Sequence, residues 1–227
     1  MTFADQVIRF TKRLKPKWPI PANYELIYPY NNPECWRVFT IFYKEYYADN
    51  LSRRALLGIN PGRLGTGVTG IPFTDPVTLD SNLGIPNSFE KKSELSSQFI
   101  HLMINELGGP TRFFRRFYVG SVCPLGFLVG GKNCNYYDDP KLEAAVMPLI
   151  IDSLTSLIGM GIKTDVAFSI GQGKNFKFLK SINAEYHFFE RIIPLPHPRW
   201  VMQYQKRHMQ NHILAYSNAL VDVPLDE

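Results

Sequence analysis

The strongest constraint on the fold is a set of four short apolar runs that alternate with helical patterns. The runs occupy residues 54–60, 117–123, 165–170 and 187–194 and are rich in β-branched and aromatic side chains. The first and third are almost continuously apolar, which is typical of strands covered on both faces. Strands that alternate with helices form parallel sheets with helices on both sides. We therefore predict an α/β fold: a three-layer α/β/α sandwich with a central four-stranded, mainly parallel sheet.

Helices are predicted between and around these strands. Residues 94–107 carry one apolar stripe, follow the N-cap candidate Ser93 and stop at Gly108. Helices are also expected over residues 143–159, 174–182, 2–14 and 202–221. Residues 74–92 have the composition of a long polar loop, and loops of that length in compact domains are usually functional. Because the 227 residues contain no repeat and no linker, we expect residues 1–227 to form a single domain.

Composition narrows the function classes. No apolar stretch approaches the roughly 20 residues that span a bilayer, and the N-terminus lacks the apolar block of a signal peptide. We therefore expect a soluble, intracellular protein without a membrane partner. Three cysteines, Cys35, Cys123 and Cys134, without a C-x-x-C pair, fit neither a disulfide framework nor a zinc site. A net charge of +5 is compatible with a polyanionic partner and equally with an ordinary enzyme.

A glycine-rich segment, residues 56–73, surrounds Asn60. Gly65, Gly67 and Gly70 match the G-x-G-x-x-G fingerprint, which raises the alternative of an NAD-dependent enzyme. A dinucleotide turn leaves its strand at once and opens a long helix, whereas here the first glycine stands five positions after Asn60 and Ile-Pro-Phe follows the last. Residues 126–133 are similarly close to a phosphate-binding loop, but Asn133 stands where Ser or Thr should hold magnesium.

Two polar side chains are expected at the carboxyl ends of strands. Asn60 ends the first run, and His197 follows the last run within a proline-rich stretch. Open parallel sheets bind ligands beyond the carboxyl ends of their strands, so these side chains should face one crevice. Asn60-Pro61-Gly62 is also an ordinary turn sequence, and a lone histidine is often structural. The pairing of the two strand-end groups favours a site.

At these positions the chain resembles the uracil-DNA glycosylase superfamily, closest to its single-strand-selective monofunctional branch. The resemblance rests on Gly58-Ile-Asn60-Pro-Gly62, Thr69-Gly-Ile-Pro-Phe73 and His197-Pro198, with Phe73 thirteen positions after Asn60. Ser93-Glu-Leu-Ser-Ser97 and Val122-Cys123-Pro124-Leu125 are similar to two further segments of that branch. The resemblance runs from about residue 50 to 215, and the order and spacing of the motifs make it more specific than any one of them.

The resemblance implies a monofunctional DNA glycosylase of base excision repair that removes uracil. We expect modified uracils and deaminated purines as further substrates, and neither a cofactor nor a metal. Asn60 and His197 would be the catalytic residues. His197 would donate a hydrogen bond to O2 of the departing base, while the Asn60 amide, which cannot take up a proton, would orient water or substrate. Phe73 would stack on the flipped base, unless it is an ordinary core aromatic. Bare backbone at Gly62 and Gly65 would line the base pocket.

DNA contacts are expected around and after His197. A flipped base leaves a gap in the duplex, and the loop 199–202, which begins with Arg199 and Trp200, would fill that gap. Lys206 and Arg207 would track phosphates or form a solvated turn. Lys174, at a predicted helix start, is another phosphate candidate. The expected partner is single-stranded or duplex DNA, bound by a monomer.

Two positions depart from the family pattern. Ser121 stands where the family recognises uracil with Asn, and a hydroxyl that can donate or accept predicts looser discrimination among bases. The His197 motif continues as Pro-Arg-Trp without the usual Ser-Pro, which predicts a differently shaped wedge. The alternative function is a nucleic-acid- or nucleotide-binding protein that kept the pocket and lost the chemistry, but the intact Asn60 and His197 argue against it.

Overall fold

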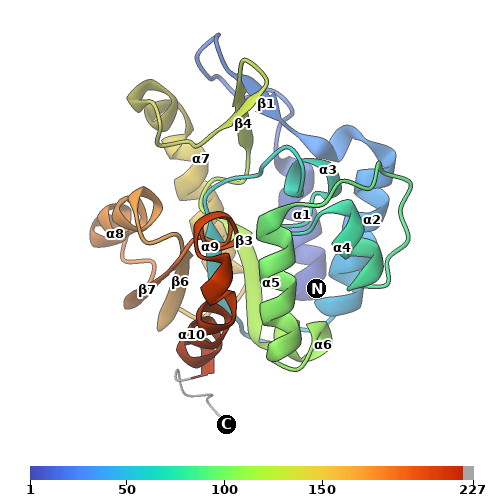
Figure 1. Ribbon diagram of the computed structural model, residues 1–227. Helices are drawn as coiled ribbons and strands as arrows, with labels where there is room; N and C mark the ends of the chain where they lie inside the picture. The colour runs from blue at the N-terminus through green and yellow to red at the C-terminus, as the bar shows by residue number, and fades with distance from the viewer. Residues whose placement is uncertain (222–227) are drawn as a thin grey trace.

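A computed structural model describes residues 1–221, and a four-stranded parallel sheet forms its centre (Figure 1). The strands are β2 (Arg54–Gly58), β3 (Phe117–Ser121), β6 (Val166–Ile170) and β7 (Arg191–Leu195), in the order β3-β2-β6-β7. All neighbouring pairs are parallel, as predicted. The last strand begins at residue 191 and not 187, because His187 adopts a left-handed conformation that ends the preceding helix.

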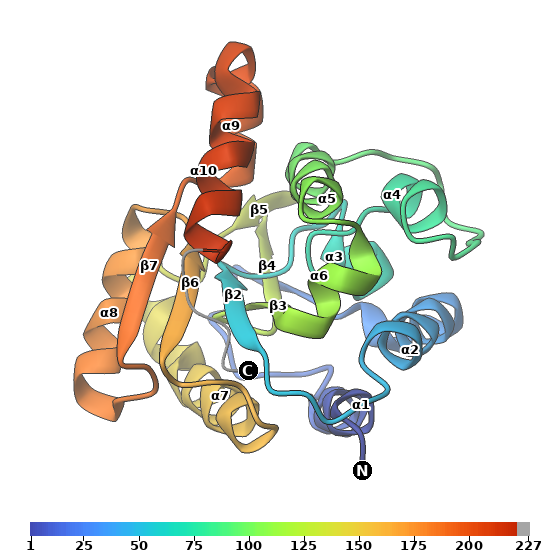
Figure 2. The ribbon, with the colours of Figure 1, turned by 90° about the horizontal axis from the view of Figure 1, so that it is seen from below.

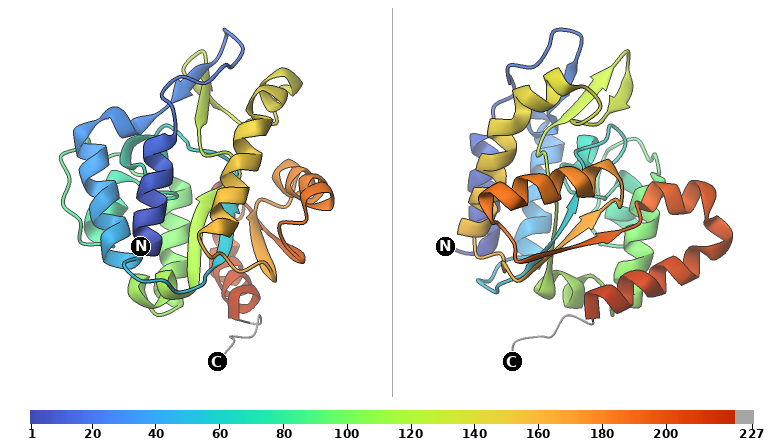
Figure 3. Two further views of the ribbon diagram at one scale, coloured as in Figure 1. Left: turned by 180° about the vertical axis from the view of Figure 1, so that it is seen from behind. Right: turned by 90° about the vertical axis from the view of Figure 1, so that its left-hand side faces the viewer.

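Helices cover both faces of this sheet, which confirms the predicted three layers (Figure 2). On one face lie α7 (Pro140–Gly159) and α8 (Lys174–Tyr186). On the other lie α5 (Leu95–Glu106) and α10 (Met209–Val221). Beyond the β3 edge, α1 (Phe3–Arg13) packs beside α2 (Pro33–Tyr46), as Figure 3 shows. The remaining helical segments are η1 (Pro29–Asn31), α3 (Thr66–Thr69), α4 (Pro76–Ser81), α6 (Pro110–Arg116), α9 (Pro198–Tyr204) and η2 (Lys206–His208).

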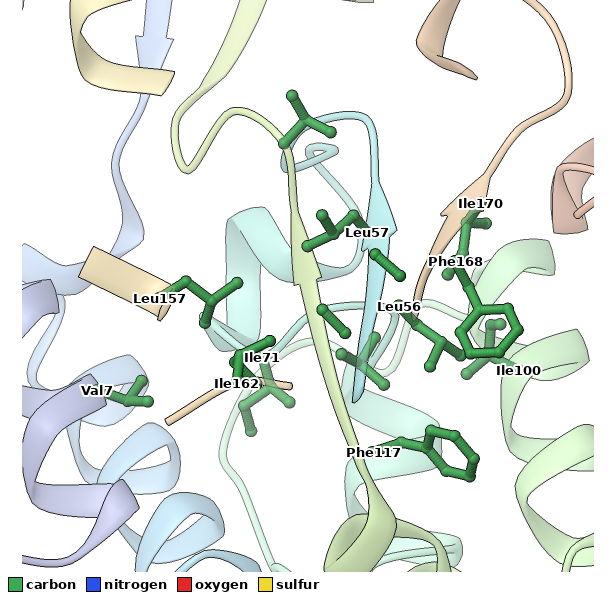
Figure 4. Close-up of a cluster of buried hydrophobic side chains, with 14 of the residues drawn as sticks. Val7, Leu56, Leu57, Ile71, Ile100, Phe117, Leu157, Ile162, Phe168 and Ile170 are labelled. Atoms are coloured by element: carbon green, nitrogen blue, oxygen red, sulfur yellow. The ribbon is translucent and has the colours of Figure 1, made fainter. Parts of the chain in front are cut away.

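The central strands bury side chains on both faces (Figure 4). Leu56 and Phe168 are paired in register and lie on the side of Ile100 in α5, while Val7 of α1 and Leu157 of α7 lie on the opposite side. Full burial of one such side chain stabilises the fold by about 1.5–3 kcal/mol. Packing on both faces therefore explains why the first and third runs are apolar at nearly every position.

Helix α7 is longer than predicted. It begins at Pro140 after the cap residue Asp139, whose carboxylate accepts the Lys141 N–H at 2.8 Å. Within residues 1–221, α7 is the one helix long and apolar enough to cross a membrane, although sequence inspection found no such stretch. Core helices can have the same length and apolar composition. Helix α7 packs into the core with six buried side chains: Leu142, Val146, Leu149, Ile150, Leu154 and Leu157.

A second, antiparallel sheet lies near the carboxyl end of the first and was not predicted (Figure 1). Its strands are β1 (Glu25–Ile27), β4 (Gly126–Val129) and β5 (Lys132–Cys134), in the order β1-β4-β5. Gly130 and Gly131, both with positive φ, join β4 to β5 in a tight hairpin. The segment that resembled a phosphate-binding loop is this hairpin. Strands of three or four residues are too short to show a period-2 pattern in the sequence.

Two further boundaries differ from prediction. Residues 74–92, expected as a loop, contain α4, because the Asp75 carboxylate accepts the N–H groups of Val77 and Thr78 at 2.9 and 2.8 Å. The N-cap of α5 is Glu94 and not Ser93, whose hydroxyl instead donates to Asp75 at 3.4 Å. The expected helix 202–221 is divided into α9, η2 and α10.

Candidate active site

A cavity of about 370 Å³ opens where β2 and β3 end. It is lined by the loop after β2, the end of β3, the start of α5, the β5 hairpin and the first turns of α9. Seven residues predicted from the sequence line it: Asn60, Gly62, Phe73, Ser121, His197, Arg199 and Trp200. Segments far apart in the chain therefore meet at the carboxyl end of the sheet, where Asn60 and His197 were expected from the ends of their strands.

The Asn60 side chain is fixed by hydrogen bonds to Cys134, the last residue of β5, and to Tyr136, two positions after it. Its Oδ1 accepts the N–H of Tyr136 at 3.2 Å, and its Nδ2 donates to the carbonyl of Cys134, also at 3.2 Å. These contacts set which end of the amide is oxygen and which is nitrogen. Nδ2 also donates to the carbonyl of Pro61, at 3.4 Å. One lone pair of Oδ1 remains, so Asn60 can orient a ligand but cannot accept a proton from it.

His197 is the N-cap of α9. Its Nδ1 accepts the backbone N–H of Arg199 at 3.2 Å, so the neutral ring carries its proton on Nε2. Burial, assisted by the charge of Arg199, lowers the pKa of His197 to about 4. At neutral pH the cavity is therefore lined by a neutral imidazole whose Nε2–H is available as a hydrogen-bond donor.

Phe73 adopts a backbone conformation that is unusual for its residue type. Its φ is +51°, in the left-handed region, where a non-glycine residue is strained. Its half-buried ring lines the cavity with a centroid 6.4 Å from that of His197 and a tilt of 54°. Strain of this kind is concentrated at sites where a side chain must take a particular position.

The glycines after β2 have different local roles. A Cβ at Gly62, which lines the cavity, would lie 3.5 Å from Asn133, an ordinary contact, so internal packing does not require glycine there. A Cβ at Gly65 would lie 2.5 Å from Oε2 of Glu94. Gly65, whose backbone was expected to line the base pocket, is not among the residues that line this cavity. Its missing side chain makes room for a carboxylate.

Glu94 was not predicted as a site residue. It lies at the start of α5 and lines the cavity. Burial raises the pKa of its carboxyl, as does the nearby Asp75, while a hydrogen bond from Ser96 and the charge of Arg199 act in the opposite direction. The sequence did contain a signal for Glu94, because segment 93–97 is part of the family resemblance. Glu94 was nevertheless interpreted only as the beginning of a helix.

Polar side chains at the cavity mouth were also missed. Asn133 lies in β5 and Asn135 directly follows it. The Oδ1 of Asn133 accepts the N–H of Arg63 at 3.1 Å. Gln203 and Tyr204 come from α9, and Tyr204 is 71% exposed. The hairpin residues could not have been found without the second sheet, which brings them beside Asn60.

The segment expected to be a wedge loop is the first turn of α9. Arg199 and Trp200 are exposed at the cavity rim. Val201 and Met202 are buried, with exposed fractions of 0% and 7%, so neither is accessible to DNA. The helical geometry thus removes two of the four predicted wedge candidates, because residues on the inner side of α9 pack into the core.

The other predicted phosphate contacts lie outside the cavity. Lys174 is the exposed first residue of α8, with its ammonium 5.9 Å from the centroid of the Tyr137 ring. Lys206 and Arg207 are exposed in η2, beyond the end of α9. Among residues 1–221, no three His, Cys, Asp or Glu side chains form a group that could hold a metal ion.

Comparison with known proteins decides the family. The sequence profile of the uracil DNA glycosylase superfamily matches residues 45–221. This chain belongs to that superfamily. The crystal structure of wild-type SMUG2 from Pedobacter heparinus is similar over 96% of this chain and 97% of that one, with 46% identity and a TM-score of 0.92. The resemblance and fold class inferred from the sequence are thereby confirmed.

The glycosylase superfamily match includes the whole cavity. Residues 45–221 contain all four strands of the parallel sheet and every residue that lines the cavity, from Ile59 to Tyr204. Helix α1, strand β1 and most of α2 precede the matched region. The similarity to SMUG2 extends over 96% of the chain, so it includes most of this N-terminal part as well.

Proposed function

We propose that this protein is a monofunctional DNA glycosylase that hydrolyses the N-glycosidic bond of uracil in DNA. The observation that carries the proposal is the meeting of three groups in one cavity: the neutral His197 donor, the fixed amide of Asn60 and the strained aromatic Phe73. Membership of the superfamily supports the reaction class. The role of each residue follows from the chemistry of the bond to be broken.

Cleavage of this bond leaves negative charge on the departing base and positive charge on the sugar. The Nε2–H of His197 would donate to O2 of uracil, where the charge develops. A donor that is already oriented by its cap hydrogen bond needs little reorganisation, and one such group is worth about 10²–10³ in rate. Because His197 is neutral, it would contribute a hydrogen bond from Nε2 to the base and no positive charge.

Asn60 would hold the attacking water or the sugar. Its amide is immobilised by the backbone of Tyr136 and Cys134, so its remaining lone pair points in a defined direction. Positioning of a reactant in this way converts an encounter into an intramolecular step. The Asn60 side chain contributes geometry and does not exchange protons.

Base recognition is assigned to Phe73, Gly62 and Ser121. Phe73 would stack on the flipped base, and the bare backbone of Gly62 would allow the base to approach closely. Ser121 ends β3 beside Gly58 of β2 and would contact the base edge with a hydroxyl that donates or accepts. This flexibility supports a substrate range that extends to modified uracils and deaminated purines.

DNA would approach over α9. Extrusion of a base costs a few kcal/mol, least in single-stranded or mispaired sites, and exposed side chains at the rim would occupy the gap. Arg199 and Trp200 are the accessible members of the predicted wedge. Lys206, Arg207 and Lys174 would contact phosphates, and each contact would make binding salt-dependent. We expect an intracellular monomer that acts in base excision repair without metal or cofactor.

A cleavage assay tests the proposal. Oligonucleotides with one uracil, single-stranded and duplex, would be incubated with excess enzyme in EDTA and then treated with alkali. Uracil release should appear as strand breakage only after alkali, as expected for a monofunctional enzyme, and should be lost in His197→Ala. DNA binding without breakage would contradict the proposal and favour the inactive-binder alternative.

A further inference from the structure

Glu94 is the one carboxylic acid among the residues that line the cavity. The other polar groups there are amides, hydroxyls, the neutral His197 and the guanidinium of Arg199. An acid in this place is unexpected for a protein that binds a polyanion, because its charge repels phosphates. The roles proposed above for Asn60, His197 and Phe73 leave Glu94 unused.

The position of Glu94 is set by a buried carboxylate. Asp75 is 0% exposed, and its Oδ2 accepts the backbone N–H of Glu94 at 2.7 Å. Its Oδ1 accepts the N–H groups of Val77 and Thr78 and so caps α4. Asp75 therefore ties the start of α5 to the start of α4, and this connection presents the Glu94 side chain to the cavity.

The chain also leaves room for the Glu94 carboxylate. A methyl group on Gly65 would lie 2.5 Å from its Oε2 and 3.5 Å from its Cδ, closer to the oxygen than any real contact. Gly65 belongs to the loop that carries Asn60 and Gly62 into the same cavity. The carboxylate is thus held against the bare backbone of the catalytic loop.

No ion pair within residues 1–221 includes Glu94. Arg199 acts on it electrostatically without a direct salt bridge. A half-buried carboxylate without an ionic partner costs folding free energy unless hydrogen bonds compensate, and the hydrogen bond from Ser96 compensates in part. A carboxylate that is held in a specific position at a cost in folding free energy indicates a role for Glu94 in the reaction.

Hydrolysis of an N-glycosidic bond releases a proton from the attacking water. Asn60 cannot take this proton, because an amide has no basic site and its Oδ1 already accepts the N–H of Tyr136. His197 directs its remaining nitrogen as a donor to the base, so it is not free to act as an acceptor. Among the residues that line the cavity, this leaves the Glu94 carboxylate as the proton acceptor.

We propose that Glu94 is a catalytic residue of this site, the general base that takes the proton of the attacking water. The inference rests on the proposed glycosylase function and deepens it. As the bond between C1′ and the base nitrogen breaks, its electron pair leaves with the base. The water oxygen bonds to C1′ and one of its protons passes to Glu94. The base anion later takes a proton from solvent, and Glu94 returns its proton to solvent.

The charged groups around Glu94 suit this role. Burial and the Asp75 carboxylate raise the pKa of Glu94, while the Ser96 hydrogen bond and Arg199 of α9 lower it. His197, also in α9, has a pKa of about 4 and adds no charge at neutral pH. A raised pKa makes a carboxylate a stronger base, and general bases contribute about 10²–10⁴ in rate.

The test is the pH dependence of single-turnover uracil release in Glu94→Gln. In the wild type, the logarithm of the rate should rise with slope one as Glu94 ionises and then level off. In Glu94→Gln, the rate should fall by about 10²-fold or more and the slope should disappear. Affinity for a duplex with a tetrahydrofuran abasic analogue should be unchanged or higher, because a negative charge is removed. Glu90→Gln, an exposed acid four positions earlier, is the matched control and should behave as wild type.

Two outcomes overturn the inference without touching the glycosylase function: wild-type rates in Glu94→Gln, or a slow variant that keeps the wild-type pH profile, as a structural role would produce. Failure of the wild type to release uracil would overturn the proposed function itself. If Glu94→Gln does not fold, the rate of uracil release by Glu94→Ala is measured at increasing formate concentrations. Recovery of rate with formate concentration supports the general base, and no recovery contradicts it.

Discussion

The ring of Phe73 lies directly against Gly58, the last residue of β2. A Cβ at Gly58 would come within 2.7 Å of the ring atoms Cε2 and Cζ. The strained backbone of Phe73 therefore delivers its ring to a place that exists only because position 58 carries no side chain. The same ring forms one wall of the cavity.

Gly58→Ala should displace the Phe73 ring and slow uracil release by about tenfold to a hundredfold, since misplacement by about 1 Å can have an effect of that size. Single-turnover cleavage measures the change. Gly159→Ala is the control, because a Cβ there meets no atom within 4 Å. Equal rates for the Gly58 variant and the wild type would show that the ring does not position the base.

His197→Ala should lower single-turnover cleavage by about 10²-fold or more, because it removes the donor to the departing base. It also removes the cap of α9, at a cost of about 0.5–2 kcal/mol. His197→Asn separates the two effects, since its side-chain oxygen can still cap the helix. Stability should return in the Asn variant while the rate stays low. DNA affinity should change only a few-fold in both, and a wild-type rate in either would remove His197 from the mechanism.

Asn60→Ala should lower both activity and stability. The N–H of Tyr136 and the carbonyl of Cys134 lose their partner, which costs about 1–3 kcal/mol where water cannot replace it. Because Asn60 and His197 act on one transition state, the double variant should be little slower than the worse single one. Chemical denaturation and single-turnover rates of the three variants give the answer. Additive losses would mean that the two side chains act independently.

Ser121→Asn should narrow the range of bases toward uracil. A hydroxyl rotates to donate or accept, whereas an amide offers a fixed donor and a fixed acceptor side by side. The wild type should therefore release xanthine or hypoxanthine measurably beside uracil, and the variant should favour uracil. Parallel cleavage of oligonucleotides with each base tests this. Strict uracil specificity in the wild type, or an unchanged preference in the variant, would assign recognition to another residue.

Stability should fall as the pH is lowered from about 6.5 towards 4, because two histidines are buried in neutral form. His101 is 3% exposed and bonded to Thr74 Oγ1 at 3.2 Å, and burial lowers the pKa of both His101 and His197 from 6.5 to about 4. In this window the unfolded chain binds more protons than the folded chain, so acid favours unfolding.

His197→Asn should make this dependence shallower by one proton. Urea unfolding at pH 7 and pH 5 measures it, and the difference between wild type and variant isolates the histidine from the carboxylates that titrate nearby. Parallel stability curves for the two proteins would show that His197 is not held neutral by burial.

Much of this architecture follows from local sequence. Four apolar runs between amphipathic helices predict the parallel sheet, since strands covered on both faces are apolar at nearly every position. The convergence of Asn60 and His197 also follows, because the carboxyl ends of parallel strands lie at one edge of a sheet. Each of these predictions depends on the periodicity of apolar residues or on the order of strands and helices along the sequence. Ser121 was identified through the family resemblance.

Helix α4 was not predicted although its Asp75 cap is local, but the other features that were not predicted depend on contacts between distant segments. Asn60 is held by the end of β5 and by Tyr136 just after it, and the strands β4 and β5 are too short to form a pattern. Their sheet is completed by β1, which pairs with β4 from more than 90 positions earlier in the chain. Val201 and Met202 face inward because α9 packs against α5, which no local signal shows. Glu94 became a cavity residue through the Asp75 bond and the space at Gly65. Burial and the space around a side chain are properties of the packed chain. The role of a residue that depends on them can therefore be inferred only from the tertiary structure.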